Sequence, residues 1–393
     1  MVDRIYLDYN ATTPVDPRVV EAMLPYFTEI YGNPASNDHD FGLEAKRAVD
    51  RAREQIARLI NARPDEIIFT SGATESDNIA ILGIAEKYAH KGRHIITCVT
   101  EHKAVLDVCQ KLERDGNRHG QYTITYLPVD QYGRVDPEAV RRAITPQTIL
   151  ISLMAANNEI GTLAALNEIA AIAAEHDIFL HTDAAQAAGH IPLDVQAMNI
   201  HIMSLSAHKM YGPKGIGALY RRRSNPRVQL EPVFYGGGHE RGVRSGTLNV
   251  PGIVGFGEAA RLAVQEMKAE SALFRRWTAH MLERLQTEFG EVYLNGHPTE
   301  RLPHNLNISI PGIKARALIP QLKGVALATG SACTSAEVKP SHVIQALGFG
   351  DERAHSALRI SVGRFNTDEQ IEIALSRLIA TVQPIRQLHM SGV

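Results

Sequence analysis

The chain of 393 residues has little of what marks secreted, membrane-bound or nucleic-acid-binding proteins. It has three cysteines and no C-x-x-C pair, which argues against a disulfide framework or a zinc cluster and favours a reducing compartment. Its 41 basic and 43 acidic residues give a net charge of −2, so no general positive field is available for nucleic acid or an anionic membrane. No apolar run approaches the length of a membrane span, and residues 1–9 lack the apolar core of a signal peptide. We therefore expect a cytoplasmic protein with no metal site, no nucleic-acid partner and no membrane partner.

Alternating strand and helix patterns fill the first 250 residues. Apolar residues recur at helical spacing over 40–60, and further helices are predicted over 74–85 and 164–174. Short apolar runs typical of buried strands lie at 66–70, 94–99, 149–154, 178–182 and 200–205. This βα repetition favours a mainly parallel sheet covered by helices.

The pattern changes near Pro251, where long amphipathic stretches begin. Helices are predicted over 257–289 and 368–383, with a strand at 305–310 between them. A loop rich in Gly, Ser and Ala follows at 329–336. At roughly 100–200 residues per domain, the chain has room for one large domain and a second, smaller one.

A lysine lies just beyond a predicted strand end, in the segment 204–212. The hydroxyl of Ser206 and the imidazole of His208 flank Lys209. A lysine at such a position is costly unless it has a partner or a covalent task, and Schiff-base formation is such a task. By itself, the segment is equally consistent with a phosphate-binding loop or a capped strand end.

A second polar segment, 181–186, follows another predicted strand. The carboxylate of Asp183 can pair there with a pyridinium nitrogen and keep a cofactor an effective electron sink, and Gln186 can bond a ring hydroxyl. Alone, Asp183 is typical of a helix cap. Asp183 together with Lys209 favours a cofactor site.

Two further segments carry groups that suit such a site. Over 70–78, a strand, a glycine turn and a helix N-terminus form a phosphate cradle of N–H groups, to which the Thr74 hydroxyl adds a donor. The same segment is also a well-capped helix start, and it holds no G-x-x-x-x-G-K-[ST] motif for a nucleotide. His102 follows the strand 94–99, where an imidazole can stack on a cofactor ring and move protons, although a lone histidine is more often structural.

The three cysteines differ in their surroundings. Cys98 and Cys109 have the bulky apolar neighbours of buried structural cysteines, whereas small residues surround Cys333 over 328–335. This composition predicts an exposed loop, which suits a nucleophilic thiolate. A small-residue turn with an incidental cysteine is the alternative.

Together, these motifs resemble the cysteine desulfurases that supply sulfur for iron–sulfur cluster assembly. Matching segments run nearly end to end, at 6–14, 31–36, 156–161, 236–247 and 359–365. The resemblance implies an α/β pyridoxal 5'-phosphate (PLP) enzyme of the aspartate-aminotransferase-like fold (fold type I), with a mainly parallel sheet in a large domain plus a smaller α+β domain. It implies a large PLP-binding domain at 12–255, and a small domain at 1–11 and 256–393 that carries the catalytic cysteine loop.

The resemblance also implies a role for each site residue. Lys209 forms the Schiff base and moves the Cα proton, His102 stacks on the ring as an acid/base, and Cys333 attacks the sulfur of L-cysteine to leave a persulfide and L-alanine. The other cofactor contacts are Ala73, Thr74, Asn158, Asp183, Gln186, Ser206, His208 and Thr247, and the substrate carboxylate is held by Asn158 and Arg359. Because Thr247 is expected to reach the phosphate of the neighbouring subunit, a homodimer is implied.

Two features depart from the family pattern. The segment 115–122 is longer than usual and is predicted to be a surface loop. The sequence stops at Val393, soon after its last predicted helix, whereas related bacterial enzymes often carry a longer tail that helps to dock a scaffold protein. The sulfur acceptor, an iron–sulfur scaffold or another protein, is therefore left open.

Three other functions compete with the desulfurase. A PLP-dependent cysteine or cystine C–S lyase needs Lys209 and Asp183 but no nucleophile at position 333, so the loop 331–335 favours the desulfurase. A selenocysteine lyase acts on a substrate of the same shape and stays open. A non-catalytic protein on this fold would be expected to have lost its lysine or its nucleophile.

Overall fold

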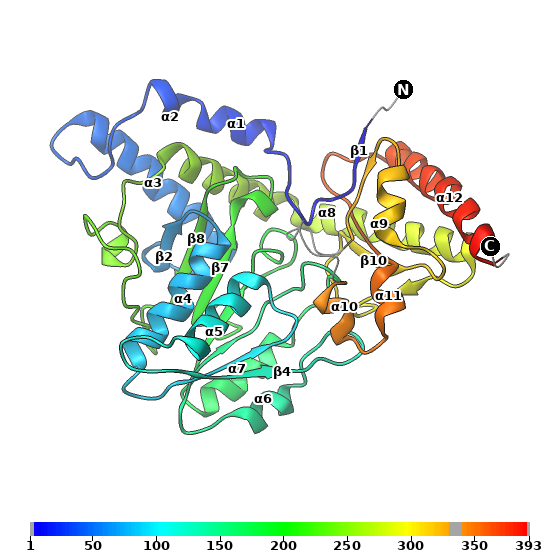
Figure 1. The fold of residues 1–393 in the computed structure, drawn as a ribbon. Helices are drawn as coiled ribbons and strands as arrows, with labels where there is room; N and C mark the ends of the chain where they lie inside the picture. Colours follow the sequence, from blue (N-terminus) through cyan, green and yellow to red (C-terminus); the bar gives the residue numbers. More distant parts are fainter. Residues whose placement is uncertain (1–3, 330–339, 391–393) are drawn as a thin grey trace.

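The computed structural model describes residues 4–329 and 340–390. Figure 1 shows a larger body around a central sheet and a smaller body that contains both ends of the chain. Cys333 lies outside the described residues. None of the helices in the described part of the chain combines the length and hydrophobicity needed to cross a bilayer.

The larger body is built on a seven-stranded sheet with the order β2-β8-β7-β6-β5-β3-β4. The strands are β2 (Ile67–Thr70), β3 (His94–Cys98), β4 (Thr123–Leu127), β5 (Thr148–Ser152), β6 (Phe179–Asp183), β7 (Ile202–Ser206) and β8 (Gly217–Arg221). All run parallel except β8, which is antiparallel to its two neighbours, β2 and β7. The predicted mainly parallel sheet is confirmed, and the carboxyl ends of its parallel strands meet at one edge.

Helices cover both faces of this sheet because alternate strand residues point to opposite sides. Ile67 and Phe69 of β2 join an apolar cluster with α3 (Asp40–Leu59), α6 (Pro137–Ala143) and α7 (Leu166–Glu175). Ile68 joins a cluster on the other face with α4 (Ala73–Tyr88) and α5 (Lys103–Arg114). The helices predicted at 40–60, 74–85 and 164–174 are thus present.

The long helix α8 (Val250–Phe289) connects the two bodies (Figure 1). Up to Ala263, its buried residues belong to the cluster of the larger body, and from Phe274 onward they belong to that of the smaller body. The helix passes the predicted domain boundary at residue 255 without interruption. The domain limits stay a prediction.

The smaller body combines short sheets with helices, as the predicted α+β class requires. An antiparallel sheet has the order β12-β10-β9, and a parallel pair joins β1 to β11. Its strands are β1 (Ile5–Tyr6), β9 (Tyr293–Leu294), β10 (Asn305–Ser309), β11 (Val325–Ala326) and β12 (Ala357–Ser361). Its helices are α9 (Ala315–Leu318), α10 (His342–Ala346), α11 (Asp351–His355) and α12 (Asp368–Met390).

The N-terminal residues therefore begin in the smaller body and then cross to the larger one. After β1, the chain passes over the carboxyl edge of the large sheet and enters α1 (Pro17–Met23) and α2 (Pro25–Thr28). The segment 115–122, between α5 and β4, lies at the surface, with residues 118–121 exposed as predicted.

Candidate active site

Lys209 lies in a helical turn directly after β7, at the carboxyl edge of the sheet. Its Nζ donates hydrogen bonds to the backbone carbonyls of Asn10 and Ala11, at 2.6 and 2.8 Å. The N–H of Thr13 donates to the carbonyl of His208 at 3.0 Å. The N-terminal segment 10–13 thus lies against the predicted cofactor lysine.

Asp183 ends β6 at the same edge and is 7% exposed. Its Oδ1 accepts a hydrogen bond from the N–H of Ala185 at 2.8 Å. Burial raises the pKa of Asp183, while that N–H and the nearby side chains of His102 and Lys209 oppose the rise. The structure therefore brings Asp183, His102 and Lys209, three of the predicted site residues, close enough to interact electrostatically.

A buried polar pair, Asp77 and His181, lies close to Asp183. The carboxyl of Asp77 is fully buried, and its Oδ1 lies 3.5 Å from Nε2 of His181. Burial and the nearby Asp183 raise the pKa of Asp77 well above its usual value, and burial lowers the pKa of His181 to about 3. The imidazole also bonds the hydroxyls of Ser152 and Ser204. Burial thus favours the uncharged forms of both Asp77 and His181.

His102 caps α5 through its ring. Its Nδ1 accepts a hydrogen bond from the N–H of Ala104 at 3.1 Å. A neutral imidazole whose Nδ1 is an acceptor carries its proton on Nε2. His102 can therefore present a defined donor to a bound group.

Gln186 forms a reciprocal pair with Asn10. Its Nε2 donates to the Asn10 carbonyl at 2.9 Å, and its Oε1 accepts from Asn10 Nδ2 at 2.8 Å. The Asn10 Oδ1 accepts from Asn305 Nδ2 in the smaller body at 3.2 Å. Asn10, which the sequence did not single out, thus connects Lys209, Gln186 and Asn305. No local pattern indicates such a role, because all three partners are distant in sequence.

The predicted phosphate cradle lies beside Ser206. Thr70 and Ser206 both pair with Gly217 of β8, from opposite sides. A Cβ added to Gly217 would lie 2.6 Å from Cα of Gly72, so only glycine permits this approach. Gly72 precedes α4 and has no side chain to cap it, so the first-turn N–H groups of α4 are suited to an anion.

The other predicted phosphate ligands differ in position. Burial and the nearby lysines lower the pKa of His208 to about 4, so its ring is neutral at pH 7, and its Nδ1 bonds Thr12 Oγ1 at 3.1 Å. Thr74 is exposed in the first turn of α4, and Ala73 begins that helix. Thr247 is exposed on a loop that Arg244 ties to Glu75 of the first turn of α4 at 2.7 Å.

Arg359 and Asn158, the predicted carboxylate ligands, lie together between the two bodies. The Arg359 side chain is 2% exposed; its Nη1 donates to the carbonyl of Asn158 at 3.0 Å and its Nη2 to Asp8 Oδ1 at 2.8 Å. The backbone N–H of Arg359 donates to the carbonyl of Ala328 at 2.7 Å. The guanidinium plane is thus oriented by the protein itself.

The two cysteines that the structure describes are buried and free. Burial raises the pKa of the Cys109 thiol to about 12, and it raises that of the Cys98 thiol well above its usual value. Neither thiol is suited to nucleophilic attack. Within residues 4–329 and 340–390, no group of three or more His, Cys, Asp or Glu is arranged to hold a metal ion.

The model of the class-V aminotransferase family matches residues 5–374. The chain belongs to this family.

Curated relatives of this class-V aminotransferase carry the name that the motifs suggested. The chain is 52% identical to the cysteine desulfurase IscS of Neisseria meningitidis serogroup C / serotype 2a, over 98% of this chain and 93% of that protein. It is 50% identical to the IscS of Rickettsia conorii, over 98% and 92%. The resemblance to cysteine desulfurases is therefore confirmed.

Solved structures show the same fold. A structure described as a NifS-like protein superposes with a TM-score of 0.89 at 35% identity, over 97% of this chain and 99% of that one. One described as SspA in complex with cysteine gives 0.81 at 37% identity, over 92% and 99%. The predicted fold class is confirmed.

The cofactor of this class-V enzyme is PLP, and the residues at the sheet edge fit it. The N-terminus of α4 offers N–H groups to the phosphate, and a methyl on Gly72 would meet no atom within 4 Å, so there is room at this turn. Asp183 is a buried carboxylate for the ring nitrogen, and Lys209 is an amine close enough to interact with the charge of Asp183.

Proposed function

We propose that this class-V aminotransferase is a cysteine desulfurase, which converts L-cysteine to L-alanine and takes the sulfur onto its own Cys333 as a persulfide. The main structural support comes from the backbone contacts of Arg359. The backbone of Arg359 exchanges hydrogen bonds with Ala328, at 2.7 and 3.1 Å. The segment that carries Cys333 therefore begins beside the proposed substrate site. The desulfurase names of the relatives support the same activity.

Arg359 and Asn158 would bind the carboxylate of L-cysteine. A guanidinium suits this planar anion because it offers paired, charge-assisted hydrogen bonds. The bonds from Arg359 to Asp8 and to the Asn158 carbonyl hold its side chain in place. Substrate binding then costs little further ordering of the protein.

Proton transfer at Cα would fall to Lys209. Bound PLP supplies an electron sink for the charge that develops at Cα. Lys209 would attach to the cofactor and, once displaced by the substrate amine, take the Cα proton. The carbonyls of Asn10 and Ala11 can hold the resulting ammonium. Asp183 would pair with the ring nitrogen, and His102 would offer its Nε2 proton.

Sulfur transfer would fall to the thiolate of Cys333. The thiolate attacks the sulfur of the substrate, an S–S bond forms, and the C–S bond breaks. The electron pair of the broken bond passes to the carbon, which takes up a proton and yields L-alanine. A C–S lyase would need no thiol at position 333, so the fate of the carbon skeleton separates the two functions.

The deciding experiment compares wild type with Cys333→Ala, and with Cys109→Ala as a buried control. We expect Cys333→Ala to bind PLP normally but to lose alanine formation by roughly two orders of magnitude or more, as removal of a covalent nucleophile does. Mass spectrometry without reductant should find one extra sulfur on the Cys333 peptide. Alanine formation at the wild-type rate by Cys333→Ala would contradict the assignment, and pyruvate release would identify a lyase. The same assay with L-selenocysteine measures any selenocysteine lyase activity.

We also propose a homodimer in which Thr247 reaches the phosphate site of a second copy. Large apolar side chains are exposed on the larger body, including Tyr235 (83%), Tyr31 (66%), and Leu24 and Phe27 (58% each). In a dimer, contact with a second copy would cover such side chains. Sedimentation should give twice the mass of one chain, and Thr247→Ala should weaken PLP binding. A fully active monomer at low concentration would contradict the dimer.

We place the enzyme in the cytoplasm, because a persulfide-forming thiol needs a reducing compartment. Its sulfur would pass to an iron–sulfur scaffold protein or to another acceptor protein. Attack of an acceptor thiolate on the outer sulfur of the Cys333 persulfide transfers that sulfur and restores the Cys333 thiol.

A further inference from the structure

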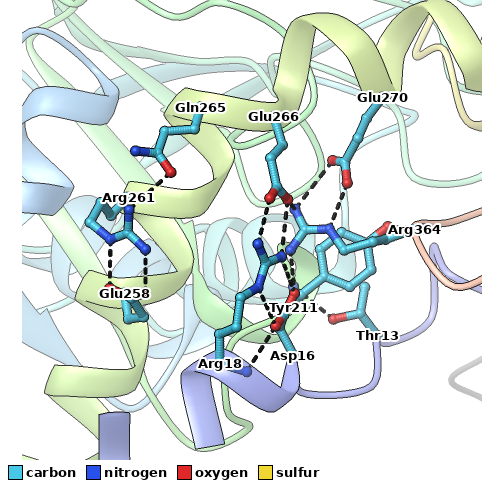
Figure 2. A network of polar contacts seen from close by, with 10 residues as sticks. All are labelled: Thr13, Asp16, Arg18, Tyr211, Glu258, Arg261, Gln265, Glu266, Glu270 and Arg364. Atoms are coloured by element: carbon cyan, nitrogen blue, oxygen red, sulfur yellow. Dashed lines mark hydrogen bonds and ion pairs between the residues drawn. The ribbon is translucent and has the colours of Figure 1, made fainter. Parts of the chain in front are cut away.

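Arg364 lies where four parts of the chain meet, just after β12. Figure 2 shows its guanidinium between three carboxylates. Its Nη1 lies 2.7 Å from Asp16, its Nε 2.5 Å from Glu270 and its Nη2 3.0 Å from Glu266. Asp16 belongs to the N-terminal segment, and both glutamates belong to α8. Arg18 makes a second bridge between Asp16 and Glu266.

These charges are largely buried and permanent at neutral pH. The side chains of Arg364 and Asp16 are 10% and 2% exposed. Burial opposes the charge of Arg364, but its hydrogen bonds to Glu270 outweigh this effect and raise its pKa. Hydrogen bonds from Arg18 and Arg364 hold the pKa of Asp16 well below its usual range. Loss of Arg364 would therefore leave buried carboxylates with less compensation.

The flat face of Arg364 lies on the ring of Tyr211. The guanidinium carbon is 4.2 Å from the ring centroid, and the backbone N–H of Arg364 donates to the Tyr211 hydroxyl at 2.8 Å. Tyr211 is buried and adopts φ of 64°, a left-handed conformation that a bulky residue keeps only where its surroundings enforce it. Arg364 is one of the groups that enforce it.

Tyr211 in turn fixes the backbone that leaves Lys209. Its N–H donates to Thr13 Oγ1 at 2.8 Å, and its carbonyl accepts from the N–H of Asp16 at 3.0 Å. The Thr13 hydroxyl donates to the carbonyl of His208 at 3.1 Å. The backbone is thus fixed on both sides of Lys209, at His208 and at Tyr211. Arg364 in turn fixes Tyr211 (Figure 2).

We propose that Arg364 is a positioning residue for Lys209. Its guanidinium clamps Tyr211 and Asp16 together, and it thereby fixes the backbone position from which the lysine side chain reaches the cofactor. Arg359 lies in β12, shortly before Arg364, so the clamp also sets the substrate arginine relative to the cofactor lysine. The inference rests on the role proposed above for Lys209.

The test compares Arg364→Gln with Arg261→Gln. Arg261 is a matched control, since it pairs with Glu258 and Gln265 of its own helix α8 (Figure 2). PLP is added to each apo-protein, and the rise of visible absorbance gives the rate of attachment to lysine. Thermal unfolding of each apo-protein reports stability separately. We expect Arg364→Gln to slow attachment roughly tenfold, because displacements of about 1 Å from distant substitutions have effects of this order or larger. Arg261→Gln should attach PLP at the wild-type rate.

Two further variants keep the test decisive. Arg364→Lys should recover part of the rate, since an ammonium can pair with Glu270 or Asp16 but cannot stack as a plane on Tyr211. Thr13→Val removes the acceptor of the Tyr211 N–H without changing a charge, and it should also slow attachment. Wild-type attachment rates in Arg364→Gln, with or without a lower unfolding temperature, would overturn the inference. If that variant does not fold, a wild-type rate in Thr13→Val overturns it. Borohydride labelling of another lysine in the wild type would instead contradict the role of Lys209.

Discussion

A methyl group added at Gly217 should separate the two elements of the proposed phosphate site, which are the N-terminus of α4 and Ser206. The added Cβ would lie 2.5 Å from the carbonyl oxygen of Leu205 and 2.6 Å from Cα of Gly72. Ordinary contacts begin at 3.4 Å, so β8 must move by 0.9 Å relative to Leu205 of β7, and the Gly72 turn must move by 0.8 Å relative to β8. Both contacts are with backbone atoms, which cannot rotate away. We expect Gly217→Ala to lose about 1–3 kcal/mol of stability, the usual cost of overpacking.

The same movement should weaken PLP binding. It carries the N-terminus of α4 away from Ser206, and the loss of one charge-assisted hydrogen bond, about 1.5–3 kcal/mol, corresponds to roughly tenfold or more in affinity. Equilibrium dialysis measures this affinity, and urea unfolding of the apo-protein measures stability. Gly215→Ala is the control: its φ of 79° makes alanine strained, at about 1–2 kcal/mol, but its Cβ meets no atom within 4 Å. If the two variants are equally destabilised and bind PLP equally well, the phosphate does not lie between Gly72 and Ser206.

Two other outcomes follow from the site. Lys209→Ala should abolish the visible absorbance of lysine-bound cofactor while PLP is still held non-covalently, and borohydride should label Lys209 in the wild type; a label elsewhere refutes the assignment. Burial raises the pKa of Glu101 to about 8, above its unfolded value of about 4.5, so the wild type should lose stability relative to Glu101→Gln as pH rises from 4.5 to 8. If the free energies of unfolding of wild type and Glu101→Gln instead change with pH in parallel over this range, Glu101 is ionised in the folded protein.

Regular elements were predictable where one local pattern decides them. The strands at 94–98, 179–183 and 202–206 are short segments with adjacent apolar residues and are buried on both faces, as suits strands between two helical layers. The helix 103–114 was missed although it carried a signal, since Val105, Val108, Cys109 and Leu112 recur at helical spacing. The antiparallel direction of β8 had no such signal, because the direction of a strand depends on its connections rather than on its side chains.

The sequence by itself determined the chemistry of the site: an amine, a carboxylate and an imidazole after strand ends are readable because each follows a local pattern, and a thiol among small residues is readable in the same way. Only the tertiary structure decided which of these groups meet and what holds them. Asn10 contacts Gln186 and Asn305, and Arg364 contacts Asp16 and Tyr211, across separations that no local pattern encodes. Such contacts arise when a chain crosses between two packed bodies. Their partners are therefore set by the whole fold and not by neighbouring residues.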